Sequence, residues 1–98
     1  MKSVDINYSN TTYQNSQHLK DVIEQCDNDT FMVVSTGTVV YFSMLSNFKL
    51  YAYNVEQSAT ECILVGELYG MNVFVDPTLT YDNNTVEFYN RSPFKFLK

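Results

Sequence analysis

The sequence predicts an α+β domain, and three observations lead to this fold class. Leu19, Val22, Ile23 and Cys26 recur at the spacing of one helix face. The continuous apolar run Phe31–Val34 is typical of a strand covered on both faces. Later in the chain, short apolar or alternating segments are bounded by Gly, Pro and Asn, which is the pattern of strands. At 98 residues and 11.3 kDa the chain has room for one compact domain.

The composition excludes several classes of protein. Hydrophobic residues make up 45% and aromatic residues 15% of the chain, which excludes disorder throughout. Six Lys and Arg stand against eleven Asp and Glu, and no base occurs from Leu50 to Asn90. A nucleic-acid groove needs clustered bases, so we expect no direct nucleic-acid partner. No apolar run approaches the roughly 20 residues of a membrane span, and the amino end lacks the apolar centre of a signal peptide. We therefore expect a soluble protein made in the cytoplasm, without a membrane partner.

The thiols and the histidine do not predict a reactive centre. Cys26 and Cys62 are the only cysteines, and we interpret them as two small buried apolar residues, with a disulfide or redox pair as the alternative. His18 is expected on the solvated side of its helix. Two thiols and one histidine without ligand spacing cannot complete a four-ligand zinc site, so we expect neither a metal nor a cofactor.

The first part of the chain is predicted to be an arm followed by a helix. Residues 1–15 are polar and lack a sustained period, so they form either a mobile arm or a strand that needs a partner. The single domain is placed at residues 16–98. Ser16 is a suitable N-cap for the first helix, and Asp27–Asp29 is expected to end it.

A second helix is predicted over Thr38–Ser46, after a capping residue in Ser35–Gly37. The β-branched and aromatic residues of this segment favour a strand. In contrast, Val39, Phe42 and Leu45 share one helical stripe, and we follow this spacing.

A weak strand or a long loop is expected over Phe48–Val55. The strands Cys62–Val65 and Met71–Val75 then form a hairpin, and Gly66 and Gly70 are predicted to bracket its turn, because glycine reaches positive φ without steric cost.

The hairpin is followed by a turn and a third strand. Asp76-Pro77 is expected to stop the hairpin, because proline has no N–H to give to the sheet. Asp82–Asn84 predicts a turn. Thr85–Tyr89 alternates and predicts a strand with Val86 and Phe88 on one face.

Three blocks of sequence point to a known family. They are Asn28–Ser35, Val65–Pro77 and Tyr89–Phe94, and over about residues 16–94 they keep the order and similar spacing of the corresponding segments in that family. Together they resemble the major capsid proteins of tailed phages, and the T-even-type branch of the Hong Kong-type capsid fold looks closest. The resemblance implies the axial domain of a capsid subunit, a small mixed β-sheet flanked by two helices that surrounds the symmetry axis of the capsomer.

The resemblance also implies a function. It predicts a non-enzymatic structural component of the virion, the axial domain of a major capsid or vertex subunit or a truncated derivative, whose partners are other capsid subunits in a homo-oligomer. The contacts are expected in two loops, residues 49–60 and 78–84, because tyrosine gives large contact area at low entropy cost. The candidate contact residues are Tyr51, Tyr53, Glu56, Tyr81 and Asp82.

Two alternatives remain open. Family members have an amino-terminal arm and a long spine helix that this sequence lacks, so the chain could instead be a small phage-encoded binding protein that docks on full-length capsid subunits and modulates or decorates assembly. The other alternative is a small acidic hydrolase that pairs Asp76 with Glu67 or Asp82, since acid–base work needs two carboxylates. The structural interpretation of Asp76 is a strand terminator whose side chain bonds nearby backbone.

Overall fold

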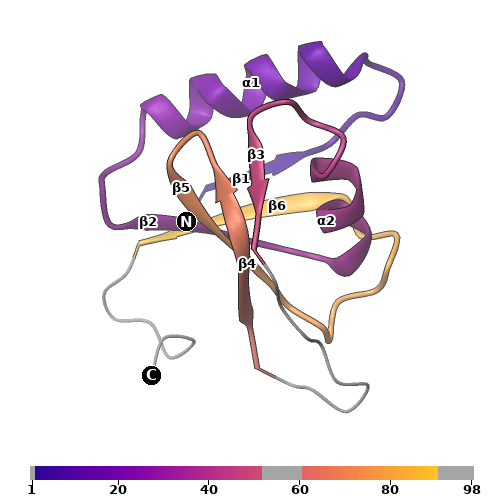
Figure 1. Cartoon of the computed structure of the whole chain (residues 1–98), viewed down its shortest axis with the longest axis vertical. Coiled ribbons are helices and arrows are strands. Elements are labelled where there is room, and N and C mark those ends of the chain that lie inside the picture. The colour runs from indigo at the N-terminus through magenta and orange to yellow at the C-terminus, as the bar shows by residue number, and fades with distance from the viewer. Residues whose placement is uncertain (1, 52–60, 91–98) are drawn as a thin grey trace.

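The computed structural model describes residues 2–51 and 61–90, which form a six-stranded mixed sheet with two helices (Figure 1). The elements are β1 (Lys2–Asp5), α1 (Thr12–Glu24), β2 (Thr30–Val34), α2 (Thr36–Phe42), β3 (Phe48–Leu50), β4 (Ile63–Leu68), β5 (Met71–Val75) and β6 (Thr85–Asn90). The prediction of an α+β fold with a small mixed sheet and two helices is confirmed. Neither helix within the described ranges is long and apolar enough to cross a membrane.

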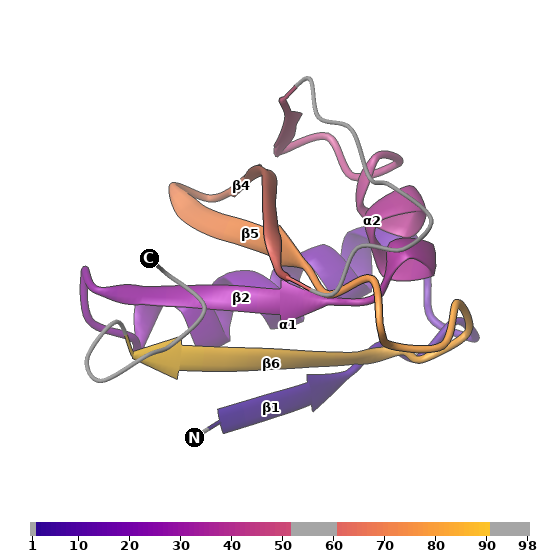
Figure 2. The ribbon, with the colours of Figure 1, turned by 90° about the horizontal axis from the view of Figure 1, so that it is seen from below.

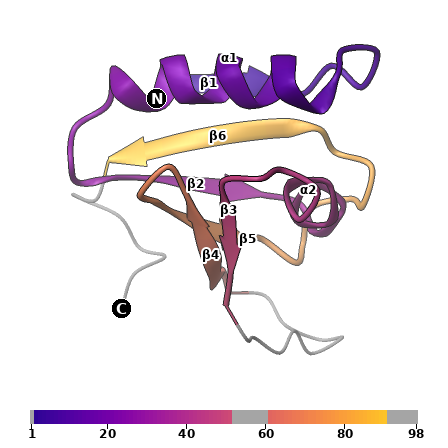
Figure 3. The same ribbon diagram turned by 45° about the horizontal axis from the view of Figure 1, so that its top comes forward.

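The sheet has the strand order β1-β6-β2-β5-β4-β3. β2 and β5 run parallel, and every other neighbouring pair is antiparallel. Figure 3 shows β6 and β2 running across the view while β3 and β4 are turned steeply against them. This is the cumulative twist that strands of L-amino acids produce.

Both helices pack on one face of the sheet. Figure 2 shows α1 behind β2 and β6. The core on this side joins Leu19 of α1 and Val39 and Phe42 of α2 to alternate strand residues such as Met32 and Val34. The prediction that Phe31–Val34 is covered on both faces is confirmed, because all four residues are buried.

On the opposite face, Phe31, Val33 and Phe74 form a smaller cluster, against which Cys62 and Tyr89 pack. We call this the second face. The two faces exist because successive side chains of a strand point to opposite sides.

The first helix begins earlier than predicted. Its N-cap is Thr11, not Ser16, because Thr11 and Gln14 form a capping box. The N–H of Gln14 donates to the Thr11 hydroxyl at 3.1 Å, and the N–H of Thr11 donates to the Gln14 side chain at 2.9 Å. Ser16 is buried inside the helix, where its hydroxyl is hydrogen-bonded to the hydroxyl of Tyr69.

The polar amino-terminal segment was interpreted as a mobile arm or as a strand that needs a partner, and in the structure it forms the strand. Lys2–Asp5 pairs antiparallel with β6. The N–H of Ile6 donates to the carbonyl of Asn84 at 2.9 Å, and the Ile6 side chain is buried in the main core. Residues 2–6 therefore add an outer strand to the sheet.

The second helix is confirmed but is shorter than predicted. It starts after its N-cap Ser35 and ends at Phe42. Beyond that point the N–H groups of Met44 and Leu45 donate to carbonyls three residues back, which tightens the chain into turns. Leu45 is still buried. The predicted apolar stripe of Val39, Phe42 and Leu45 therefore packs in the core, although Leu45 lies beyond the end of the helix.

The hairpin of β4 and β5 is confirmed, but its predicted turn is corrected. Gly66 lies inside β4, paired with Val73, and does not bracket the turn. A Cβ at this position would meet the Lys49 carbonyl oxygen at 2.3 Å, so glycine lets β3 approach β4. The turn consists of Tyr69 and Gly70, both at positive φ, which suits a two-residue hairpin.

The remaining predicted strands are present. β3 begins at Phe48, where a weak strand or a loop was expected over Phe48–Val55, and residues 52–55 of that segment lie outside the described residues. β6 follows the predicted alternation, with Val86 and Phe88 buried in the main core.

Candidate functional site

The predicted contact residues fall in different environments. Tyr51 is half-buried, and its N–H donates to the carbonyl of Val65 at 2.8 Å, so its backbone is tied to β4. Tyr81 and Asp82 are exposed. Tyr53 and Glu56 lie outside the described residues. Of the candidates that the structure describes, Tyr81 and Asp82 are therefore the two whose side chains are open to a partner.

Tyr81 and Asp82 lie at the edge of a cavity of about 370 Å³ beside α2. We call its lining the α2 surface, which consists of Tyr8, Gly37, Val40, Tyr41, Met44, Tyr81 and Asp82. Four of these are large apolar side chains in solvent: the exposed fractions are 54% for Tyr8, 51% for Val40, 62% for Met44 and 64% for Tyr81.

The second helix supplies one wall of the cavity. Val40 of α2 and Met44, which lies in the turn after the helix, both line the cavity. Val39 and Phe42 point into the main core from the other side. The segment is therefore apolar on two sides, and only one of them is covered by the sheet.

Hydrogen bonds and a ring contact hold Tyr41, which lines the cavity, in its position. Tyr41 is buried, and its hydroxyl accepts a hydrogen bond from the side-chain amide of Asn15 at 2.7 Å. That amide also donates to the carbonyl of Asn7 at 2.9 Å. The ring of Tyr8 stands edge-on to the ring of Tyr41, with 5.1 Å between the centroids, a favourable aromatic geometry.

The loop that carries Tyr81 is held against the start of α2. The hydroxyl groups of Ser35 and Thr38 donate to the carbonyl of Asn83 at 2.7 and 3.0 Å. Gly37 has no Cβ, and one would meet the carbonyl oxygen of Tyr81 at 2.0 Å. The loop can reach its position only because this residue is glycine.

The chemistry of the α2 surface suits binding. Among the described residues that line the cavity, Asp82 is the only charged one. Tyrosine edges and a thioether offer polarisable contact area to an apolar group, and a carboxylate at the rim suits a basic neighbour. We therefore expect an occupant that presents an apolar side chain beside a base.

Sequence analysis missed Tyr8, Val40 and Met44 at this site. A signal existed for two of them, since Val40 and Met44 form an apolar pair at helical spacing outside the Val39–Phe42–Leu45 stripe. No local signal places Tyr8 beside α2, because its neighbours come from distant segments.

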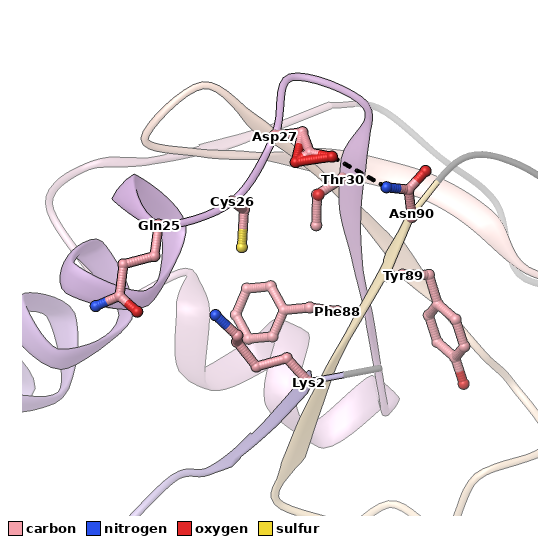
Figure 4. Close-up of a pocket in the computed structure, with 8 residues that line it drawn as sticks. All are labelled: Lys2, Gln25, Cys26, Asp27, Thr30, Phe88, Tyr89 and Asn90. Atoms are coloured by element: carbon pink, nitrogen blue, oxygen red, sulfur yellow. Dashed lines mark hydrogen bonds between the residues drawn. The ribbon is translucent and has the colours of Figure 1, made fainter.

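A second cavity, of about 360 Å³, lies between the end of α1 and the end of β6 (Figure 4). Its lining residues are Lys2, Gln25, Cys26, Asp27, Thr30, Phe88, Tyr89 and Asn90. In Figure 4 the Lys2 amine lies near the Phe88 ring, whereas the Tyr89 ring points away from both.

Three polar residues of this second cavity, Asn90, Asp27 and Cys26, form hydrogen bonds in the local structure. The side-chain amide of Asn90 donates to the carboxylate of Asp27 at 3.2 Å. The thiol of Cys26 donates to the carbonyl of Val22 at 3.2 Å. The first bond joins the α1–β2 loop to β6 and the second lies at the end of α1, so we assign the cavity no chemistry.

Two of the carboxylates of the hydrolase hypothesis, Asp76 and Glu67, lie at opposite ends of the β4–β5 hairpin. Asp76 accepts hydrogen bonds from the N–H and the hydroxyl of Thr78, at 2.9 and 2.6 Å, and so acts as the expected strand terminator before Pro77. Glu67 pairs with Asn72 at the other end of the hairpin. Within the described ranges, no cluster of three or more acidic, cysteine or histidine side chains is arranged to hold a metal.

The two cysteines lie on opposite faces of the sheet. Cys26 packs against the main core and Cys62 against the second face, and both are half-buried free thiols. Burial, followed by the charges of Asp76 and Glu87, raises the pKa of the Cys62 thiol from 9.0 to about 11. Burial, with Glu87 next, also raises the pKa of Tyr89.

We expect the alkylation rate of Cys62 to keep rising with pH well beyond 9, where an ordinary thiol is already ionised. The thiol contributes stability that is complete below its unfolded pKa of 9.0 and is lost as the pH rises through about 11. Iodoacetamide kinetics in a Cys26→Ser background measure this profile. Glu87→Gln should move it to lower pH and Glu67→Gln should not; a profile that levels off near pH 9 would contradict the assignment.

No protein-family model, curated protein or solved structure matches the chain. The resemblance to tailed-phage capsid proteins therefore depends on the three sequence blocks alone, and the function has to be inferred from these blocks and from the geometry of the α2 surface.

Proposed function

We propose that this chain is a subunit-contact domain of a tailed-phage capsid, a non-enzymatic structural component of the virion that joins neighbouring capsid subunits around a capsomer axis. The observation that carries this proposal is the α2 surface. It gathers Tyr8, Val40, Met44 and Tyr81, all more than half exposed, around one cavity.

Exposed apolar side chains that gather in one place have a physical cost. Scattered apolar residues on a surface are ordinary, but a contiguous group is typical of a contact surface. Tyrosine and methionine are also enriched in protein interfaces, where a few such residues supply most of the binding energy. This composition favours a protein partner.

The arrangement of the three family-like blocks supports the choice of partner. The first block contains β2, the second contains most of the β4–β5 hairpin, and the third begins in β6. β2 lies between β5 and β6, so the three blocks are neighbours in the sheet. The helix α2, which carries the contact surface, follows β2 directly (Figure 1).

The proposed mechanism is geometric. A ring closes when one surface of each subunit contacts a different surface of the next and the rotation returns to the start. The α2 surface is one of the two surfaces that meet in this contact. Each contact can be weak, because a closed ring holds every subunit by two of them.

Sedimentation velocity tests this function. The chain should self-associate as its concentration rises, and the double substitution Met44→Ser with Tyr81→Ser should weaken association about tenfold or more, as expected when two interface anchors are lost. Tyr13→Ser is the matched control, because Tyr13 is 70% exposed but does not line the cavity.

The outcomes separate the proposal from its alternatives. Association that depends on Met44 and Tyr81 supports it. If the chain stays monomeric but binds a full-length T-even-type capsid subunit through the same residues, it is instead the small binding protein that docks on capsid subunits. A chain that does neither, or one whose association is equally weakened by Tyr13→Ser, refutes a role for the α2 surface.

A further inference from the structure

β1 is the outermost strand of the sheet. Among residues 2–51 and 61–90, the only strand that pairs with it is β6, and Figure 2 shows β1 beside β6 at the border of the sheet. β1 contains no proline and pairs with β6 without a bulge. Proline and bulges are devices that protect an edge strand, because an open edge is a template for a further strand. The outer side of β1 therefore suits pairing.

The hydrogen bond of Ile6 shows which backbone groups of β1 face outward. The N–H of Ile6 donates to the carbonyl of Asn84, the next position in the register of β1 and β6. In an antiparallel pair every second residue bonds to the neighbouring strand, and the residues between them direct their N–H and C=O groups the other way. Ser3 and Asp5 occupy these intermediate positions, and both are exposed. Their backbone groups therefore face the open edge.

These outward groups complement those of a second copy when two β1 strands run antiparallel about a two-fold axis at Val4. Ser3 of each copy then lies opposite Asp5 of the other, and each such pair exchanges both of its N–H···O bonds. Opposite side chains share a face of the sheet, so the Ser3 hydroxyl can donate to the Asp5 carboxylate. The Thr85 hydroxyl already holds this carboxylate at 2.8 Å, and an ionised carboxylate can accept several hydrogen bonds.

The residue at the axis also favours this arrangement. Val4 is half-buried and packs against the main core. At the axis, Val4 of one copy meets Val4 of the other at a position without hydrogen bonds, where the side chains of antiparallel strands come closest. The main cores of the two copies are then joined across one continuous sheet.

Other registers of the two strands are less favourable. An axis at Asp5 sets two carboxylates opposite each other, which is destabilising. An axis at Ser3 pairs only residues 2–4 of the described strand with each other. An axis between two residues sets outward backbone groups against inward ones, so no ladder of hydrogen bonds forms. The axis at Val4 is the register that uses the whole strand without opposing like charges.

We propose that β1 is a dimerisation edge, which pairs antiparallel with β1 of a second copy about a two-fold axis at Val4. Such an isologous contact closes with two chains. The inference does not depend on the proposed function, because no residue of β1 lines the α2 surface. Its tests use the full chain with Met44→Ser and Tyr81→Ser, which removes association through the α2 surface, so each proposal can fail without the other.

Amide hydrogen exchange followed by NMR tests the edge directly. The amides of Ser3 and Asp5 should exchange about tenfold or more slowly in concentrated than in dilute solution, since they become bonded only in the dimer. The amide of Ile6, which bonds to Asn84 in the same chain, should be protected even in dilute solution. It is the internal control for the integrity of the β1–β6 pair.

Proline at position 3 tests the backbone bonds. Ser3→Pro removes an outward N–H and leaves the bonds between β1 and β6 in place, so it should raise the Kd of the dimer in sedimentation velocity by about tenfold or more. Ser3→Ala is the matched control: it keeps the N–H and loses only the hydroxyl, and the Kd should rise by no more than about threefold. Protection of the Ile6 amide shows that β1 still pairs with β6 in both variants.

Charge tests the register. Ser3→Lys sets a lysine opposite Asp5 of the second copy, and it should lower the Kd about fivefold through two opposite-charge pairs. Adding Asp5→Lys to this variant sets lysine opposite lysine and should reverse the gain. The second variant carries more positive charge than the first, so a general effect of net charge would instead lower the Kd further.

Each outcome decides the proposal. Slower exchange of Ser3 and Asp5 at high concentration, with the expected order of Kd values, supports it. Fast exchange at every concentration overturns it. Equal protection at every concentration overturns pairing with a second copy and identifies a segment of the same chain at the edge. A Kd that Ser3→Lys leaves unchanged, or that falls further when Asp5→Lys is added, overturns the register centred on Val4.

Discussion

Phe42→Ala is expected to lower the free energy of unfolding by about 3–5 kcal/mol, the usual cost of removing a buried phenylalanine. Phe42 is fully buried, and its ring meets the ring of Phe48 edge-on at 5.6 Å. The substitution removes both the buried area and this aromatic contact. In a chain of 98 residues, this corresponds to a fall in Tm of roughly 12 °C or more. Urea denaturation followed by circular dichroism measures the loss.

Val40→Ala is the matched control for Phe42→Ala. Val40 lies on the same helix but is half exposed on the α2 surface, so its substitution should change stability by no more than about 0.5 kcal/mol. A loss below about 1 kcal/mol for Phe42→Ala would mean that α2 does not pack on the sheet as described. Equal losses for the two variants would contradict the assignment of the two sides of α2.

Gly37→Ala is expected to cost about 1–3 kcal/mol of stability, as overpacking usually does, and to displace the loop that carries Tyr81. The added Cβ would meet the Tyr81 carbonyl oxygen at 2.0 Å. This oxygen belongs to the backbone, so no side-chain rotation relieves the clash. We also expect weaker association through the α2 surface, because Tyr81 leaves its place.

Urea denaturation and the amide NMR signals of residues 81–83 report the two effects of Gly37→Ala. Thr36→Ala is the neighbouring control, since it removes atoms at the start of the same helix and adds none toward the loop. Unchanged amide signals with unchanged stability would show that the loop does not contact Gly37.

The strands and helices follow largely from local patterns in the sequence. The spacing of Leu19, Val22 and Ile23 predicted α1, and the alternation of Val86 and Phe88 predicted β6. Such patterns succeed because each element has to present one apolar side to the core. The residues of the second helix favour a strand by propensity, but the spacing of Val39 and Phe42 predicted a helix. The helix forms because the free energy gained by burying these two side chains outweighs the weak conformational preference of the backbone.

The sequence-based predictions were wrong at residues whose contacts lie far away in the chain. Ser16 has the chemistry of an N-cap, but its hydroxyl is bonded to Tyr69, more than fifty residues away. Gly66 has the chemistry of a turn residue, but it lies in a strand because Lys49 of β3 comes so close to it. Local sequence carries no information about either neighbour.

Periodicity and composition alone were enough to establish the fold class, the hairpin and the apolar sides of the elements, because each depends on residues close together in the chain. The α2 surface needed the folded chain. Tyr8, Met44 and Tyr81 come from three separate segments. Ser35 and Thr38 hold the loop of Tyr81 through Asn83, and Asn15 joins the segment of Tyr8 to Tyr41. Contacts of this kind depend on chain closure over long separations, which no local pattern encodes.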